Sequence, residues 1–182
     1  MSEVTAEEDK RAGSTVSVAT RHVMQANKGK NTKPELVVRS HLREAGFPGY
    51  RLHWKKCPGK PDVCYPGRKI AIFVNGCFWH RCPHCNLPMP KTNVEFWQQK
   101  FRRNRERDEA NVARLLEAGW SVLVVWECAL KRGRAQATLA ELVREVELAT
   151  LGITCRGRLV EVGYSSAWRR RMMRSRLAPI RR

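Results

Sequence analysis

Three cysteines stand close together in the chain, with a spacing that could hold a metal ion. Four residues separate Cys77 from Cys82, and two separate Cys82 from Cys85. This is the spacing of loops that bind zinc through thiolates. A tetrahedral site needs a fourth ligand, which we expect to be Cys128, and His84 is an alternative to Cys85 in the loop. Four protein ligands leave no open position on the metal, so such a zinc ion would be structural.

A carboxylate and a histidine on either side of an apolar stretch could carry a hydrolytic reaction. Asp62 follows Pro61 and precedes the apolar residues 69–75, which is the order found in the first half of the PD-(D/E)xK nuclease pattern. In that pattern the carboxylate holds Mg²⁺, which polarises the scissile phosphate. The second half of the pattern, an acidic residue and a lysine, is replaced here by apolar residues and Asn75. His80 is therefore the nearest candidate for a general base that activates water.

Glu35 is a second carboxylate that could serve the same site. Thr32 and Glu35 have the spacing of a capping box, which predicts a helix over about residues 33–45. Val38 and Leu42 follow Glu35 at helical spacing, so the three share the face that packs against the core. Glu35 is either a capping residue alone or a capping residue that also approaches the metal, and the two roles are compatible.

Alternating and apolar stretches predict the strands of a central sheet, and longer periodic stretches predict helices around it. Strands are expected at residues 50–54, 61–65, 69–75 and 120–126, and further helices at 94–118 and 135–149. The strand at 120–126 is apolar on both faces, so it should lie in the middle of the sheet. A loop that leaves a neighbouring central strand would then come close to Cys128. The expected fold class is α/β, a mixed central sheet flanked by helices.

The charge of the chain indicates a nucleic-acid partner. The formal net charge is +18, from 35 basic and 17 acidic side chains, which is more than solubility needs and favours a polyanion. Candidate phosphate contacts are Arg102 and Arg103 in the helix at 94–118, and Lys28 and Lys30 in a basic N-terminal arm. A basic protein held only by RNA contacts is the alternative.

The ends of the chain differ in composition from its middle. We expect residues 1–20 to form a disordered tail, 21–150 an endonuclease domain, and 151–182 a basic, largely disordered extension. The N-terminus is acidic and lacks the pattern of a secretion signal, and no apolar run approaches a membrane span. The chain has seven cysteines, an odd number, so reduced thiols in the cytoplasm are expected and not disulfides.

Beyond these separate signals, the chain resembles very-short-patch repair endonucleases in several motifs that occur in the same order and spacing. The likeness covers about residues 20–133, and the two tails lie outside it. The motifs that carry it are Gly59-Lys60-Pro61-Asp62, Phe73-Val74-Asn75-Gly76-Cys77-Phe78-Trp79-His80, Glu95-Phe96-Trp97, Asn104 with Arg107-Asp108, and Val125-Trp126-Glu127-Cys128-Ala129-Leu130.

The resemblance implies a restriction-endonuclease-like fold and the nicking of one DNA strand 5′ to the T of a T·G mismatch. Such mismatches arise when 5-methylcytosine is deaminated, and their correction is very short patch repair. The implied cofactors are a catalytic Mg²⁺ and a structural Zn²⁺. The implied partner is double-stranded DNA bound by a monomer at the nucleoid, with functional links to a cytosine-5 DNA methyltransferase and a repair polymerase.

The resemblance also implies roles for single residues. Asp62 would hold Mg²⁺ together with the backbone carbonyl of Val74, His80 would be the general base, and Glu35 would support the site. Some members of the family carry a second catalytic histidine where this chain has Asn75. An asparagine side chain cannot act as a general acid at neutral pH, so this position departs from the family pattern.

Two aromatic residues and a methionine are implied to contact the bases. Phe78 and Trp79 would wedge into the duplex beside the mismatch, and Met24 would enter from the opposite groove. Unstacking costs about a few kcal/mol per base step and less at a mismatch, which favours mismatched DNA. Simple packing over the cysteine loop is the alternative for Phe78 and Trp79. For the whole protein, the alternatives are a restriction-type nuclease with another target and a zinc-stabilised DNA-binding protein without catalysis.

Overall fold

The structure, a computed structural model, describes residues 29–131, 133–153 and 157–164. The chain divides into two units, Met1–Asn31 and Thr32–Arg182, and the fold described below is that of the second. Met24, Lys28 and the expected tail at 1–20 lie outside the described residues, as does the part of the basic extension at 165–182. Lys30, in the first unit, is exposed.

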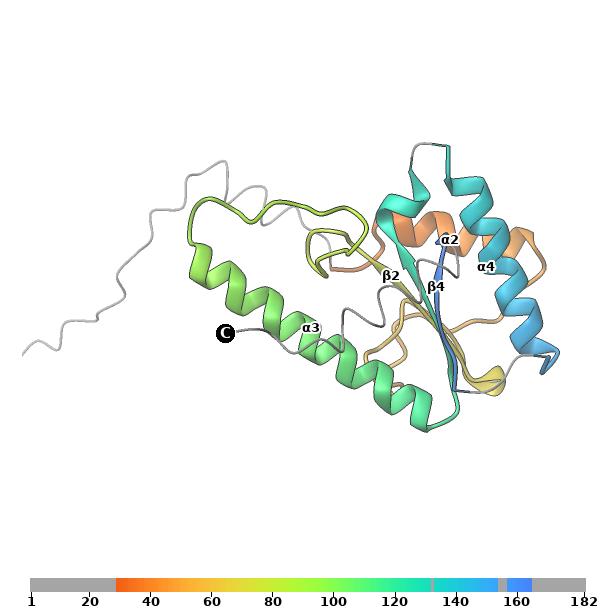
Figure 1. Ribbon diagram of the computed structural model, residues 1–182. Coiled ribbons are helices and arrows are strands. Elements are labelled where there is room, and N and C mark those ends of the chain that lie inside the picture. The colour runs from red at the N-terminus through yellow and green to blue at the C-terminus, as the bar shows by residue number, and fades with distance from the viewer. Residues whose placement is uncertain (1–28, 132, 154–156, 165–182) are drawn as a thin grey trace, which may run out of the picture. The chain divides into compact units, whose positions relative to one another are not determined.

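A four-stranded mixed sheet forms the centre of the fold (Figure 1). The strands are β1 (Val63–Tyr65), β2 (Ile70–Asn75), β3 (Ser121–Trp126) and β4 (Leu159–Val162), and they lie in the order β1-β2-β3-β4. β1 pairs with β2 in antiparallel fashion, whereas β2, β3 and β4 are parallel. The predicted mixed sheet is thus confirmed, and β3 is buried along its whole length between two neighbours, as its apolar sequence predicts.

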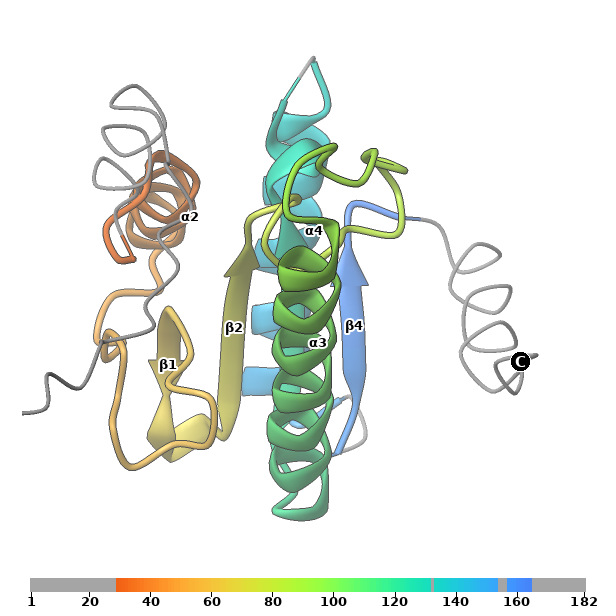
Figure 2. The same cartoon turned by 90° about the vertical axis from the view of Figure 1, so that its left-hand side faces the viewer.

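Helices cover both faces of the sheet. α3 (Val94–Glu117) lies on one face, and α2 (Lys33–Glu44) and α4 (Ala135–Thr150) lie on the other, as Figure 2 shows for α3 in front of the sheet and α4 behind it. Residues of α2 and α4 pack with alternate residues of the strands into one apolar core. Leu115 of α3 packs with the residues of the opposite face into a second core. All three helices were predicted from the sequence.

The structure differs from the sequence prediction at two places. Residues 50–54 form no strand but a single bridge between Arg51 and Cys64, because His53 has a φ of 45°, which breaks the extended backbone. In addition, β4 lies within the segment 151–182, which we expected to be a basic, largely disordered extension with only a weak strand-like piece after residue 150. Its alternating pattern places Val160 and Val162 in the core, so the sheet ends beyond residue 150.

The arrangement of the strands brings several functional candidates to one edge of the sheet. The parallel strands β2 and β3 end together, since Asn75 is paired in register with Trp126. Because β1 runs antiparallel, its first residue, Val63, is paired with Ile72, and Asp62 just before it contacts Val74 near the end of β2. The loop after β2, the 3-10 turn η2 (Glu127–Leu130) and Asp62 therefore share this edge. Such an edge is where α/β proteins commonly bind ligands. None of the helices within the described ranges is long and apolar enough to cross a bilayer.

Candidate active site

Two carboxylates and an imidazole meet at this edge. One ligand atom from each of Glu35, His53 and Asp62 lies within 4.8 Å of the others. His53 bridges the carboxylates: its Nε2 lies 3.6 Å from Glu35 Oε2, and its Nδ1 lies 3.6 Å from Asp62 Oδ1. Oxygen atoms of carboxylates are preferred ligands of hard divalent cations. The group could therefore hold a metal ion.

Asp62 directly precedes β1, and the backbone of β2 holds its side chain. The amide N–H of Val74 donates to Asp62 Oδ2 over 2.7 Å. A strand residue presents its N–H and its C=O to the same neighbour, so the Val74 carbonyl also faces the Asp62 side of β2. Burial raises the pKa of Asp62 from its ordinary value of 3.8 to about 6; the Val74 hydrogen bond opposes this shift, and the charge of Glu35 adds to it. Without a nearby cation, the ionised form of Asp62 therefore lowers the stability of the fold.

This cost gives a stability prediction for the metal-free protein. The raised pKa means that the folded state binds the Asp62 proton more tightly than the unfolded chain, so ionisation destabilises the fold as the pH rises through about 4 to 6. Asp62→Asn removes the charge and keeps an oxygen for the Val74 N–H. At pH 7 without added divalent metal, we expect its free energy of unfolding to exceed that of the parent by about 1–3 kcal/mol.

Urea unfolding of both proteins at several pH values checks this result. The difference should disappear below about pH 4, where Asp62 is protonated in both states. A difference that stays constant across the pH range would show that the ionisation of Asp62 is not its cause.

Glu35 caps α2, and its carboxylate also contacts groups of the cluster. Its Oε1 accepts hydrogen bonds from the backbone N–H of Thr32, over 3.3 Å, and from the Thr32 hydroxyl, over 2.9 Å, at the start of α2. Its Oε2 accepts from the buried guanidinium of Arg39, over 2.5 Å, one helical turn further on. Arg39 offsets part of the negative charge of the two carboxylates, which permits Glu35 to remain buried next to Asp62. Glu35 is thus a cap whose carboxylate also reaches the cluster.

His80, at the start of the loop after β2, is paired with an acid on α3. Its Nδ1 lies 2.5 Å from Asp108 Oδ2. Burial raises the pKa of Asp108, but the hydrogen bond and charge of His80, with a contribution from Arg107, outweigh burial and keep that pKa below its ordinary value. An ionised carboxylate only accepts hydrogen bonds, so Nδ1 carries the ring proton and Nε2 of a neutral His80 is a proton acceptor. The charge of His80 also acts on Asp62 and lowers its pKa.

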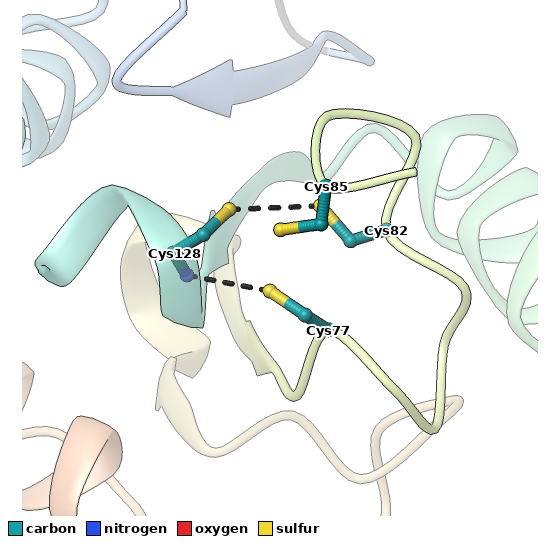
Figure 3. Close-up of side chains that lie close together, drawn as sticks. All are labelled: Cys77, Cys82, Cys85 and Cys128. Carbon is teal, nitrogen blue, oxygen red and sulfur yellow. Dashed lines mark hydrogen bonds between the residues drawn. The ribbon is translucent and has the colours of Figure 1, made fainter. Parts of the chain in front are cut away.

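Four cysteine side chains form a second cluster, from the loop after β2 and from η2 after β3. The sulfur atoms of Cys77, Cys82, Cys85 and Cys128 all lie within 4.8 Å of one another, and Figure 3 shows them turned toward a common point between the loop and η2. Cys82 Sγ and Cys128 Sγ are 3.6 Å apart, and the N–H of Cys128 donates to Cys77 Sγ over 3.3 Å. Four thiolates in this arrangement suit zinc.

The thiols of this cluster differ in the direction of their pKa shifts. Burial raises the pKa of Cys77 to about 12, and burial also raises the pKa of Cys82. Burial alone would raise the pKa of Cys128 as well, but the hydroxyl of Tyr164, 2.9 Å from its sulfur, and the other cysteines hold that pKa below its ordinary value. Zinc would displace the remaining thiol protons, because thiolates are the species that bind it.

His84 lies beside the cysteines but contacts other groups. Its ring stacks on that of Tyr164, with a centroid separation of 3.2 Å and an interplanar angle of 6°. Its Nε2 is 3.5 Å from Glu161 Oε2, and its backbone N–H donates to Cys82 Sγ over 3.4 Å. This geometry favours Cys85 as the loop ligand. His84 instead packs on Tyr164 and donates its backbone N–H to the sulfur of Cys82.

The predicted base contacts are part of an aromatic cluster on α3. The ring centroid of Phe78 is 5.2 Å from that of Trp79, 5.2 Å from that of Trp97 and 5.3 Å from that of Phe101. Trp79 also contacts Trp97, with centroids 5.9 Å apart, and its backbone carbonyl accepts a hydrogen bond from Asn104 over 3.0 Å. Phe78 and Trp79 thus pack on α3, and a role of these rings in DNA binding stays a prediction.

The remaining predicted positions lie on α3 and at the end of β2. Arg102 and Arg103 are exposed on α3, which leaves their charges accessible to a polyanion. Asn75 ends β2, one residue beyond Val74 and in register with Trp126.

Two residues of the site, Asp108 and His53, were given no role in the sequence analysis. Asp108 lies on the inward stripe of α3 among apolar residues, and an acid on such a stripe is a signal that it has a polar partner. His53 precedes Asp62 by nine positions in the chain, and its place between the carboxylates depends on a loop conformation that no local pattern indicates.

Comparisons with known proteins agree with the motifs noted in the sequence. A sequence model of the family described as DNA mismatch endonuclease Vsr matches residues 16–87. The type II nicking enzyme V.XorIIP of Xanthomonas oryzae pv. oryzae is 42% identical over 125 residues, which are 68% of this chain and 90% of the relative. The type II nicking enzyme V.NmeAIP of Neisseria meningitidis is 41% identical over 128 residues, 69% of this chain and 89% of the relative.

A third relative carries the name of the family itself. The DNA mismatch endonuclease Vsr of Escherichia coli is 41% identical over 125 residues, which are 68% of this chain and 78% of the relative. This extent of identity, together with the family match across Glu35, Asp62 and His80, leads to one conclusion: the chain belongs to the Vsr family of DNA mismatch endonucleases.

Proposed function

We propose that this protein nicks one strand of duplex DNA 5′ to the T of a T·G mismatch, by metal-dependent hydrolysis of a phosphodiester bond. Its relatives are named a mismatch endonuclease and nicking enzymes. The observation that carries the proposal is the meeting of the Asp62 cluster and the His80–Asp108 pair at one edge of the sheet, close enough that the charge of His80 acts on Asp62. A carboxylate that binds a metal ion and a histidine that activates water are together sufficient for the hydrolysis of a phosphodiester bond.

In this proposal His80 is the general base. Asp108 accepts a hydrogen bond from the Nδ1–H of His80 and so fixes the ring tautomer. Nε2 can then take a proton from the attacking water, and the imidazolium that forms is stabilised by the ionised Asp108. Arg107, which contacts Asp108 Oδ1 over 3.0 Å, helps to keep that carboxylate charged.

Asp62 and the backbone carbonyl of Val74 would hold Mg²⁺, and Glu35 would support the site. A bound Mg²⁺ would polarise the scissile phosphate and offset the negative charge that develops during the reaction. The residues fit such an ion, since the carboxylates offer oxygen ligands and the buried Asp62 gains from a nearby positive charge. Asn75 has no acidic proton to give a leaving group at neutral pH.

DNA binding would use the aromatic and basic residues around this centre. Phe78 and Trp79 would enter the base stack beside the mismatch, with Met24 from the other groove, and mismatched pairs favour this because they unstack more easily. Arg102, Arg103, Lys28 and Lys30 would contact phosphates. The four cysteines would hold a structural Zn²⁺ that fixes the loop carrying the aromatic pair and His80.

A T·G mismatch is the product of deamination of 5-methylcytosine opposite guanine. The proposed enzyme would therefore act on DNA that a cytosine-5 DNA methyltransferase has modified. It would do so as a monomer, on nucleoid DNA in the cytoplasm. A nicked T strand needs resynthesis, so a repair polymerase would follow it.

Variants of the His80–Asp108 pair are expected to lower the rate of the chemical step. His80→Gln removes the proton acceptor, and we expect kcat to fall by about 10²–10⁴-fold. Asp108→Asn should leave the ring in place but lose the ionised partner, with a loss of about 10²-fold or more. Single-turnover nicking measures both rates, and a gel-shift assay checks that the Kd for DNA is kept. A parental rate for His80→Gln would exclude it as the base.

A panel of duplexes tests the proposed substrate. Four duplexes of one length carry T·G, T·A, C·G or 5-methylcytosine·G at the central position, and each is incubated with protein and Mg²⁺. We expect nicking of T·G only, and we expect Trp79→Ala to weaken this preference. Equal cutting of T·A would indicate a restriction-type nuclease. Binding of every duplex without cutting of any would indicate a DNA-binding protein without catalysis.

A further inference from the structure

His53 is a titratable side chain at the centre of the site that the mechanism above does not use. Its side chain is 17% exposed, and its two ring nitrogens face opposite carboxylates, Nδ1 toward Asp62 and Nε2 toward Glu35. Arg39 also approaches Nε2, at 3.1 Å. The ring is therefore enclosed by charged groups on both sides.

The backbone holds His53 in this place at a cost. Its φ of 45° is in the left-handed region, which is strained by about 1 kcal/mol or more for a residue with a side chain. The bridge between Arg51 and Cys64, with hydrogen bonds of 2.7 and 2.9 Å, ties the loop of His53 to the strand that follows Asp62. Strained residues that the surrounding structure fixes occur preferentially at functional sites.

The order Glu35–His53–Asp62 has the form of a carboxylate–histidine–metal arrangement. A histidine that binds a metal through one ring nitrogen commonly donates the N–H of the other nitrogen to a carboxylate, which orients the ring. Here Nδ1 lies on the side of Asp62, the expected metal ligand, and Nε2 lies on the side of a buried glutamate. The residues on the two sides of the ring are thus of the kinds that this arrangement needs, with Glu35 Oε2 at 3.6 Å from Nε2 and Asp62 Oδ1 at 3.6 Å from Nδ1.

We propose that His53, through Nδ1, is a ligand of the divalent metal held by Asp62, and that this nitrogen makes the site bind Mn²⁺ more tightly than Mg²⁺. The inference rests on the proposed function, because it assumes a metal at Asp62. In the metal-free site Nε2 accepts a hydrogen bond from Arg39, because a guanidinium group can only donate. The ring proton is then on Nδ1. A metal at Nδ1 would require the other tautomer, with the proton on Nε2; the Nε2–H would then donate a hydrogen bond to Glu35, and Arg39 would give up its contact with Nε2 and keep the one with Glu35.

The preference for Mn²⁺ follows from the ligand set. Mg²⁺ is a hard ion that binds oxygen and retains its water, whereas imidazole nitrogen suits transition metals. Mn²⁺ accepts both kinds of ligand. Loss of His53 should therefore weaken Mn²⁺ binding much more than Mg²⁺ binding.

Binding of the two ions to the full, zinc-loaded chain tests this. The variant is His53→Asn, because asparagine tolerates the left-handed conformation better than most residues, with His53→Gln as a second variant and circular dichroism as the check of folding. Free Mn²⁺ is measured by electron paramagnetic resonance, and Mg²⁺ by competition. We expect the Kd for Mn²⁺ to rise about tenfold or more, and the Kd for Mg²⁺ to change less than about threefold.

The spectrum of bound Mn²⁺ provides a direct readout of the nitrogen. Electron spin-echo modulation should show coupling to an imidazole ¹⁴N in the parent and in the control His80→Gln, and no such coupling in either His53 variant. Retention of the coupling in the His53 variants, or an equal loss of affinity for both ions, would overturn the proposal. Nicking of T·G by the parent with Mg²⁺ is measured separately, so a failure of the proposed function and a failure of the His53 assignment give different results.

Discussion

Asp62→Asn is expected to abolish the nicking of a T·G duplex while leaving DNA binding intact. The amide has the shape of the carboxylate and can still accept from the Val74 N–H, but it lacks the charge that holds the catalytic cation. A metal contributes several kcal/mol to the stabilisation of the transition state, so we expect the rate to fall by about 10³-fold or more. The Kd for DNA should change little. The neighbours of Asp62 are Glu35, His53 and Val74, and the substitution does not alter the exposed basic residues that would bind phosphates.

Single-turnover cleavage of a labelled duplex measures this effect. Glu117→Gln, a loss of the same charge at the exposed end of α3, is the matched control and should cut at the parental rate. A parental rate for Asp62→Asn would remove Asp62 from the reaction. If the parent also failed to cut and both bound DNA equally, the protein would be a DNA-binding protein without catalysis.

Cys128→Ser is expected to remove zinc and most of the stability of the fold together. The four cysteines come from two segments, the loop after β2 and η2 after β3, so zinc would join the ends of the two central strands. Structural zinc contributes about 10–16 kcal/mol of apparent binding free energy, whereas the net stability of a domain is about 5–15 kcal/mol. We expect the zinc content to fall from about one per chain to near zero and the variant to unfold at a much lower temperature.

Metal analysis and thermal unfolding measure the two effects, and two variants provide controls. Cys57→Ala changes a buried cysteine outside the cluster and should keep its zinc. His84→Gln should also keep zinc, because the ring stacks on Tyr164, whereas Cys85→Ser should lose it. A zinc content near zero in purified, folded parent protein would contradict the assignment.

Much of the fold was predictable because its signals are local. The capping box of Thr32 and Glu35 fixes the start of α2, and the unbroken apolar sequence of β3 is sufficient to place it in the middle of the sheet. The approach of Cys128 to the loop cysteines could also be inferred, because parallel neighbouring strands end at the same edge.

The rest of the site depends on contacts that the sequence does not encode locally. The place of His53 requires a left-handed residue inside a stretch whose alternation predicts a strand. Asp108 meets His80 only because α3 packs across the face of the sheet where the loop after β2 lies. Tyr164 reaches Cys128 because β4 pairs with β3, although its sequence lies in a segment of tail-like composition.

The position of the cut tests the central claim most directly. A duplex with one T·G mismatch is labelled separately on each strand and incubated with the zinc-loaded protein and Mg²⁺, and the products are mapped at single-nucleotide resolution. We expect one cut, in the T strand immediately 5′ to the mispaired T, with the G strand intact and the matched T·A duplex uncut. Cuts in both strands, or a cut at the same place in the T·A duplex at an equal rate, would contradict it.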